Sequence, residues 1–391
     1  MQANEVRVIE RRRGVPVVVF VICLVLALVL GAVAGFVGSA VAGAGPVKST
    51  GKKVDQNKLD SLHAQIEKYY KGDIVEEDLV EGAYHGYVSG LNDPYSAYMT
   101  KEEVQSDEES YESDYSGVGI TFEQNEQGGY EVVSVSKGSP AEKAGIVPGD
   151  FLLSVDGKTY SSSDVMAAHI RGDKGTKVTV EVMHDGKSED VTMVRDTIHH
   201  ETVEYRMLDD QTGYIQISGF IEGTADDFDK ALAAIEGKGA KNLVLDLRNN
   251  GGGLVDECAK VADDFLDAGV ITYVQDKNGK EETYDARDGK TGLKTVVLVN
   301  GYSASASEIL TGALQDNDFP VVGEKTFGKG VIQVTFPQKD GSGLKLTIME
   351  YLTPDRHPVH KKGVTPNTEI EDDEDTDADE QLDKAKELVE K

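Results

Sequence analysis

The sequence predicts an α/β protein that begins with a transmembrane helix and a helical segment, continues in a small strand-rich module and ends in an α/β layer. Three observations predict this. No residue in 14–47 is charged, alternating strands fill 115–195, and apolar strands alternate with amphipathic helices from 196 onward. Such alternation is typical of a sheet covered by helices. With 39% hydrophobic and 28% charged residues, the chain can build more than one core.

The first element is predicted to be a transmembrane helix over 15–38, after a cytoplasmic N-terminus of 1–14. Its apolar run is longer than the ~20 residues that span a bilayer. Arg11, Arg12 and Arg13 precede it, and positive charge favours the cytoplasmic side. We therefore expect a single-pass protein of the cell membrane with the remaining chain outside the cytoplasm. The alternative is a signal peptide cleaved after Ala40-Val41-Ala42, but signal peptides have shorter apolar regions.

A linker over 39–54 leads to a helical region over 55–104. Leu59, Leu62 and Ile66 recur at helical spacing, and Asn92-Asp93-Pro94 ends the second periodic run. This region is also the expected place for pairing of two chains in a homodimer.

The strand-rich module covers 115–195, after an acidic stretch. SGVGITFEQ and GYEVVSVS are expected to be strands, Pro140 opens a short helix, and an Asp-Gly turn joins a later hairpin. The pattern predicts a small, half-open sheet with two helices.

The α/β layer covers 196–368, and an acidic tail covers 369–391. GYIQISGF, NLVLDL and KTVVLVN are its first expected strands. The tail holds twelve acidic residues and three lysines, which indicates a solvated, partly disordered or helical end. The net charge of −30 excludes nucleic acid as a partner, because phosphates would repel the chain.

The stretch GYSASASEIL, 301–310, follows the apolar strand KTVVLVN. Ser305-x-x-Glu308 fits a capping box, in which both side chains bind the first amides of a helix. On local sequence alone, that structural role is favoured. The position at the end of a buried strand is, however, where residues with chemical roles gather.

A serine nucleophile needs a base and an oxyanion site. None of the eight histidines lies in a recognisable Ser/His/Asp or HExxH pattern. Lys329 lies between glycines before an apolar strand, where desolvation would lower its pKa, although a surface lysine in a glycine turn remains the alternative. Gly251, Gly252 and Gly253 follow the strand in DLRNNGGG, so their amides could face an oxyanion. No metal ion or organic cofactor is implied.

Four motifs together resemble the C-terminal processing (tail-specific) proteases, a family of Ser/Lys peptidases with an inserted PDZ domain. The motifs are SASASEIL, TFGKGVIQ, DLRNNGGG and YLTPDRHPVHKKGVTPN. The resemblance implies Ser305 as nucleophile, Lys329 as general base and Gln333 as the residue that orients the lysine. It also implies an oxyanion hole from the amides of Ala306 and of either Gly252 or Gly253.

The module at 115–195 resembles a PDZ domain. Gly117, Val118, Gly119 and Ile120 stand at the carboxylate-binding loop, where amides hold the terminal carboxylate of a peptide that adds to the sheet edge. Arg171 resembles a family arginine that couples peptide binding to the catalytic site.

The sequence therefore predicts a membrane-anchored, extracytoplasmic serine endopeptidase that binds protein substrates by their C-terminal tails. The alternative is a non-catalytic PDZ adaptor that assembles partners at the membrane.

Overall fold

The computed structural model describes residues 54–124, 129–160, 163–184, 186–287, 289, 291–371 and 378–391. The chain divides into two compact units, Met1–Val75 and Glu76–Lys391. Helix α2 (Gln56–Tyr69) belongs to the first unit, and Asp55 caps it by accepting a hydrogen bond from the amide of Asn57.

The predicted transmembrane helix at 15–38 lies outside the described residues. Among the helices that the structure describes, none is long and apolar enough to cross a membrane. The longest have 14 residues, which gives about 21 Å of helix against the roughly 30 Å of a hydrocarbon core. The predicted fold class is therefore corrected to a mixed α/β fold with no membrane-spanning helix among the described residues, and the single-pass location that depended on such a helix is not supported.

Helix α3 (Glu76–Ser89) opens the second unit and ends before the Asn92-Asp93-Pro94 turn. A short strand, β1 (Ala97–Met99), follows, and then helix α4 (Lys101–Glu109). Thr100 and Glu103 form a capping box at the start of α4, since each side chain accepts a hydrogen bond from the other residue's amide. The helix thus runs further than the expected end of the helical region at 104.

The middle module is a five-stranded antiparallel sheet in the order β3-β4-β5-β6-β7. Its strands are β3 (Ile120–Gln124), β4 (Tyr130–Val135), β5 (Phe151–Val155), β6 (Lys177–His184) and β7 (Lys187–Val194), and its helices are α5 (Pro140–Lys143) and α6 (Ser163–Ile170). Val132, Leu152, Met166 and Val180 form its separate core. A two-stranded ribbon of β2 (Asp114–Gly117) and β8 (Asp196–His199) closes the module at its two ends. Strand β3 is left as an edge.

The C-terminal part is built on a six-stranded sheet in the order β18-β15-β14-β11-β10-β9. The strands are β9 (Val203–Met207), β10 (Thr212–Ile217), β11 (Asn242–Asp246), β14 (Lys294–Val299), β15 (Val321–Gly323) and β18 (Thr368–Glu369). Only β9 pairs antiparallel. Helices α7 (Thr224–Gly237), α8 (Val255–Asp263) and α9 (Ala306–Gln315) connect the strands. All residues of β11 are buried, as expected of a strand covered on both faces.

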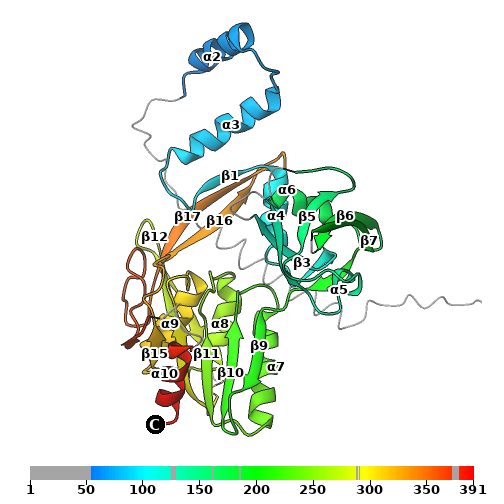
Figure 1. Cartoon of the computed structure of the whole chain (residues 1–391). Coiled ribbons are helices and arrows are strands. Elements are labelled where there is room, and N and C mark those ends of the chain that lie inside the picture. The colour runs from blue at the N-terminus through cyan, green and yellow to red at the C-terminus, as the bar shows by residue number, and fades with distance from the viewer. Residues whose placement is uncertain are drawn as a thin grey trace, which may run out of the picture. The chain divides into compact units, whose positions relative to one another are not determined.

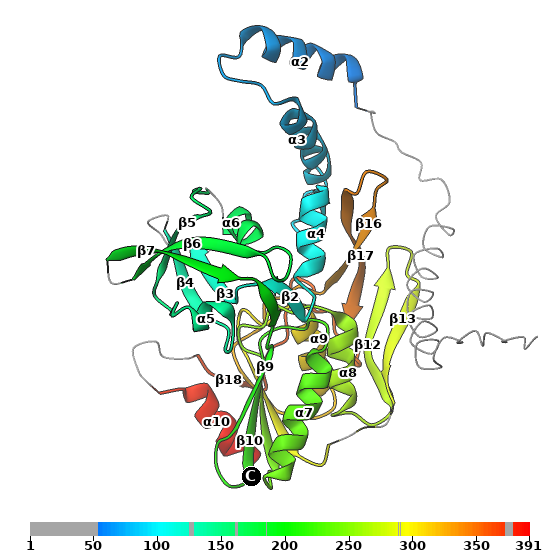
Figure 2. The same ribbon diagram turned by 90° about the vertical axis from the view of Figure 1, so that its right-hand side faces the viewer.

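A second antiparallel sheet contains the expected apolar strand after Lys329 and adds strands that the sequence interpretation did not resolve. It contains β12 (Gly269–Asp276), β13 (Glu281–Ala286), β16 (Val331–Pro337) and β17 (Gly343–Leu352), with β1 paired to the far side of β17. The hairpins β12–β13 and β16–β17 are seen side by side in Figure 2. This sheet brings residues near 97, 333 and 347 together.

Helix α10 (Glu380–Val389) lies within the stretch expected to be a solvated tail. It packs on one face of the six-stranded sheet, while α7 and α8 lie on the other face (Figures 1 and 2). Ala385 and Val389 are buried there against Val244 and Val296. Arg248 fixes the start of α10 by donating two hydrogen bonds to the Asp379 carboxylate. The exposed Asp383 and Glu387 thus lie on the outer face of a helix whose inner face is apolar.

Candidate active site

Two loops meet at the carboxyl edge of the six-stranded sheet because β11 and β14 are adjacent and parallel. The loop after β11 holds the glycine run, and the loop after β14 holds the serines. Across the two loops, the backbone amide of Asn249 donates to the side-chain oxygen of Asn300, and the side-chain amide of Asn300 donates to the side-chain oxygen of Asn249. The carbonyl oxygen of Asn250 accepts hydrogen bonds from the amide of Ala304 and the hydroxyl of Ser307. Several hydrogen bonds therefore fix the serine loop to the glycine loop.

The three serines have different surroundings. Ser303 and Ser307 are completely buried. The Ser303 hydroxyl donates to the carbonyl of Leu247 at 2.8 Å, and the Ser307 hydroxyl donates to the carbonyl of Asn250 at 2.9 Å. Ser305, in contrast, is partly exposed. Two of the serines hold the loop, and only the middle one combines access to solvent with the position before α9.

Ser305 has a backbone conformation that few non-glycine residues adopt, with φ 56° and ψ −116°. Such a conformation costs of the order of 1–3 kcal/mol and persists only where the surroundings impose it. The amide of Ser305 donates to Glu308 at 3.0 Å, and the amide of Glu308 donates to the carbonyl oxygen of Ser305. The glutamate half of the expected capping box thus holds the strained turn.

The glycine loop lies against the serine. A Cβ on Gly252 would fall 2.7 Å from the Ser305 Cβ and 2.9 Å from the amide nitrogen of Ala306, so this close approach requires glycine. The amide of Gly252 already donates to the side chain of Asn250 at 2.9 Å. Within the described part of the chain, the amides of Gly253 and Ala306 form no hydrogen bond. These two amides are therefore the ones available to an incoming oxygen.

Lys329 comes from the other sheet, just before β16. Its side chain is half-buried, and its Nζ lies 5.1 Å from the centre of the Tyr95 ring. Burial lowers the pKa of Lys329, and the positive charge of Lys345 lowers it further, while Asp107 and Glu308 act in the opposite direction. A lysine with a lowered pKa is more often neutral near neutral pH, and only the neutral amine can act as a base. Lys325, in comparison, is exposed.

A buried carboxylate joins the serine loop to the lysine loop. Glu308 is completely buried. One of its oxygens accepts from the amides of Ser305 and Lys329, and the other accepts from the hydroxyl of Thr326 and the amide of Gly328. The hydroxyl of Tyr351 also lies within hydrogen-bond distance of the carbonyl oxygens of Ser305 (2.9 Å) and Lys329 (2.7 Å). Both loops are thus held by the same two side chains.

The side chains of Ser305, Lys329 and Gln333 are not joined directly. In the described residues no hydrogen bond links the Ser305 hydroxyl to Lys329 Nζ. The Gln333 side chain donates to the hydroxyl of Thr347 on β17 at 3.1 Å. Catalytic hydrogen bonds are often long without substrate and tighten when it binds.

The predicted carboxylate-binding loop bridges the ribbon and the sheet of the middle module. The carbonyl oxygens of Val118 and Gly119 accept from the amides of Ala141 and Ser136. Across a trans peptide the next amide points the opposite way, so the amides of Gly119 and Ile120 face away from these donors. Ile120 lies opposite Val135, and the flanking residues Gly119 and Ser136 share the hydrogen bond, so Ile120 and Val135 are a non-hydrogen-bonded pair. The polar groups of Ile120 therefore face the open edge of β3.

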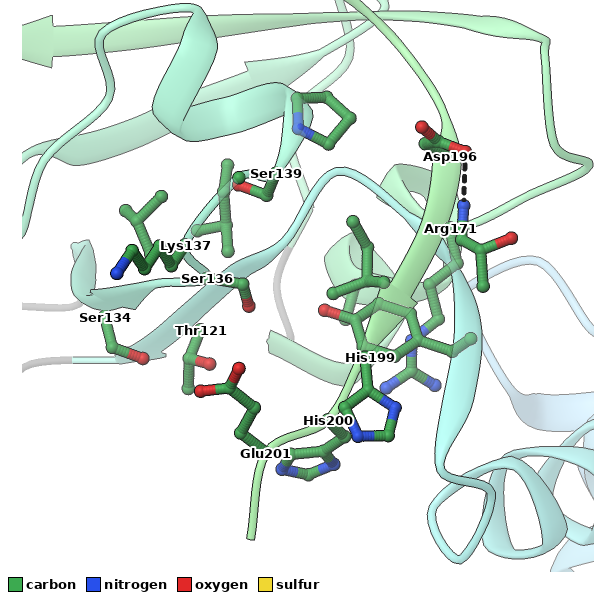
Figure 3. Close-up of a pocket in the computed structure, with 18 of the residues that line it drawn as sticks. Thr121, Ser134, Ser136, Lys137, Ser139, Arg171, Asp196, His199, His200 and Glu201 are labelled. Atoms are coloured by element: carbon green, nitrogen blue, oxygen red, sulfur yellow. Dashed lines mark hydrogen bonds between the residues drawn. The ribbon is translucent and has the colours of Figure 1, made fainter. Parts of the chain in front are cut away.

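A cavity of about 810 Å³ lies beside this edge. Thr121, Ser134 and Ser136 stand on one side of it, and His199 and His200 on the other (Figure 3). Arg171 also lines the cavity, with its guanidinium over the Tyr115 ring and 3.4 Å from Glu109 at the end of α4. The predicted coupling arginine thus contacts the helix that precedes the module.

Comparison with known proteins decides the family. Models described as peptidase family S41, PDZ domain and activating protease CtpB N-terminal domain match residues 211–370, 116–194 and 28–103. The chain is 40% identical over 339 residues to the carboxy-terminal processing protease CtpA of Bacillus subtilis (strain 168), covering 85% of this chain and 72% of that protein. The chain belongs to the C-terminal processing proteases of peptidase family S41.

This protease is also 39% identical over 332 residues to a probable CtpA-like serine protease of Staphylococcus saprophyticus, covering 83% of this chain and 67% of that one. A solved photosystem II D1 C-terminal processing protease matches it with a TM-score of 0.50 and 28% identity, over 81% of this chain and 86% of that chain. The predicted family and the enzyme class, a serine protease with a PDZ domain, are confirmed. The family favours a protease over the non-catalytic adaptor.

Sequence reasoning missed several residues at this site. Tyr95 lies against the lysine, and Tyr351 holds both loops. Glu308 was expected only as a helix cap, yet it also binds the lysine loop. The Asn92-Asp93-Pro94 motif next to Tyr95 predicts a turn, but it does not predict which other residues the turn contacts.

Proposed function

We propose that this protease cleaves peptide bonds through an acyl-enzyme on Ser305, with Lys329 as general base. The main support is the contrast among the three serines: two are buried and bound to the loop, while Ser305 is partly exposed on a strained turn. The half-buried Lys329, with its lowered pKa, supplies a group that can take the serine proton. Gln333 is proposed to orient the lysine once substrate is present.

In the proposed reaction, the Ser305 oxygen attacks the carbonyl carbon of the scissile bond and its proton passes to Lys329. The carbonyl oxygen becomes an oxyanion bound by the amides of Ala306 and Gly253. Gly253 is preferred to Gly252 because the Gly252 amide is already bound to Asn250. Lys329 then gives its proton to the leaving amine as the bond to nitrogen breaks. Water, deprotonated by Lys329, hydrolyses the ester and frees Ser305.

The PDZ domain is proposed to bind the C-terminal tail of a protein substrate as an added strand on β3. The amides of Gly119 and Ile120 would hold the terminal carboxylate, and Gly117 and Val118 shape the loop that presents them. Arg171 is proposed to transmit this binding through its contact with Glu109. Edge strand β3 offers the unpaired polar groups that such recognition needs.

The Ser305→Ala variant tests both parts of the proposal. We expect it to lose hydrolysis and labelling by a fluorophosphonate, because no nucleophile remains, while it still binds a tail peptide with a free carboxylate better than the same peptide with a C-terminal amide. Ser303→Ala and Ser307→Ala are the matched controls and should keep partial activity. Equal losses of activity in all three variants would contradict the assignment of Ser305 as the nucleophile. Equal binding of the peptide with a free carboxylate and the peptide with a C-terminal amide would contradict carboxylate recognition.

A further inference from the structure

The turn formed by Asp93, Pro94, Tyr95 and Ser96, here called the N-terminal turn, reaches the lysine side of the site. Strand β1 follows it directly and pairs with β17, with Ala97 opposite Lys345. The turn holds its own shape, since the Asp93 carboxylate accepts from the amide of Tyr95 at 3.1 Å and the hydroxyl of Ser96 at 2.6 Å. A segment more than 200 positions before Lys329 is thus fixed beside it.

Tyr95 is the residue of this turn that touches the proposed base. The Nζ of Lys329 lies 5.1 Å from the centre of the Tyr95 ring, within the range of a cation–π contact. The ring also contacts His360, with 6.5 Å between ring centres and a steep angle of 66°. Gly330 lets this loop approach, because a Cβ there would collide with the backbone of His360. Tyr95 therefore contacts both the lysine and the 358–363 loop.

The same turn also supports Gln333. The Gln333 side chain donates to the Thr347 hydroxyl, and the Thr347 amide donates to the Ser96 hydroxyl oxygen at 3.0 Å. Ser96 in turn donates to Asp93. Tyr95 thus contacts the proposed base, Lys329, and its neighbour Ser96 contacts Thr347, the hydrogen-bond partner of Gln333.

We propose that Tyr95 is a positioning residue of the proteolytic reaction, whose ring face holds the ammonium group of Lys329 in place. This inference rests on the proposed role of Lys329. The ring face favours the charged form of the lysine, which helps when Lys329 carries the proton between the serine and the leaving amine. The charged groups that also face Lys329 are Lys345, Asp107 and Glu308.

The test compares Tyr95→Phe, which keeps the ring face, with Tyr95→Leu, which keeps an apolar side chain without one. Tyr95→Phe should stay within about twofold of the parent enzyme. Tyr95→Leu should lower kcat about tenfold with little change in KM. It should also move the acid limb of the kcat/KM profile to lower pH by about half a unit, because the protonated lysine loses its partner.

Tyr98→Leu is the matched control, because Tyr98 lies on β1 and packs against Tyr84 and His85 instead of the lysine. It should change the melting temperature without moving the pH profile. Tyr95→Met replaces Tyr95→Leu if the latter does not fold. An acid limb that stays in place or moves to higher pH overturns the proposal. If Tyr95→Leu shows no shift to lower pH but the fluorophosphonate still labels its Ser305, the proposed role of Tyr95 is wrong and the proposed nucleophile is unaffected.

Discussion

The serine half and the lysine half of the site are built in different ways. The serine half comes from two adjacent loops of one parallel sheet, and Ser303, Ser307 and Asn250 in it are completely buried. The lysine half combines a loop of the antiparallel sheet with the N-terminal turn, and Lys329, Tyr95 and Gln333 are each only partly buried. The first half is specified by local sequence, whereas the second depends on segments far apart in the chain.

This difference indicates where the site can vary. The serine half has many hydrogen bonds between fixed backbone groups, so it should change little when substrate binds. The side chains of the lysine half are positioned by three contacts: the Tyr95 ring with Lys329, the ion pair between Lys345 and Asp107, and the hydrogen bond from Gln333 to Thr347. Adjustment of the catalytic geometry is therefore expected on the lysine side.

The largest effect is expected from Lys329→Arg. A guanidinium cannot give up its proton near neutral pH, so it cannot act as the base. Hydrolysis of a protein substrate should fall about 10³-fold, within the range assigned to acid–base catalysis. Lys325→Arg, at an exposed lysine four residues earlier, is the matched control and should keep full activity. More than a tenth of the parent kcat/KM in Lys329→Arg would exclude the lysine as base.

A moderate effect is expected from charges around the lysine. In the proposed mechanism the acid limb of kcat/KM reports the pKa of Lys329, and this pKa is lowered by burial and by Lys345 but raised by Asp107. Lys345→Met should therefore raise the pKa and move the limb to higher pH. Asp107→Asn should lower the pKa and move the limb to lower pH, by about half a unit in each case.

The control for both charge changes is Lys339→Met, at an exposed lysine between β16 and β17. It should leave the profile unchanged. Shifts of the same sign in Lys345→Met and Asp107→Asn would show that Lys329 does not set the acid limb.

The smallest effect is expected from Thr347→Val. This change keeps the shape of the side chain but removes the oxygen that accepts the Gln333 hydrogen bond. We expect kcat to fall about three- to tenfold, since a hydrogen bond contributes roughly 1 kcal/mol. Thr335→Val, two positions beyond Gln333 on β16, is the control. A parent-like kcat in Thr347→Val would mean that the lysine half does not need this support.

The same contrast explains what the sequence could predict. Ser305 and the glycine loop follow apolar strands directly, so periodicity and turn chemistry place them at one sheet edge. Which of Gly252 and Gly253 has a free amide depends on the Asn250 side chain, and no local pattern reports such a bond. The contact of Tyr95 with Lys329 needs β1 to pair with β17, which is a long-range event.

The two ends of the chain show the limits of composition as a predictor. The acidic residues of the C-terminal stretch left a partly disordered and a helical end both open, whereas Leu382, Ala385 and Val389 recur at helical spacing and pack on the sheet. The uncharged apolar run at 15–38 and the arginines before it predicted a transmembrane helix, but that stretch lies outside the described residues, and no helix that the structure describes meets the requirement.

The buried carboxylate of Glu308 has a mechanical consequence. Three of its four hydrogen bonds join the first turn of α9 to the segment that enters β16. Separating the two segments would expose these three donors and the negative charge at once, which is costly because hydrogen bonds to charged groups are the stronger ones. The proposed catalytic centre should consequently come apart in one cooperative step, so the amides of Gly328 and Lys329 should exchange their hydrogens together.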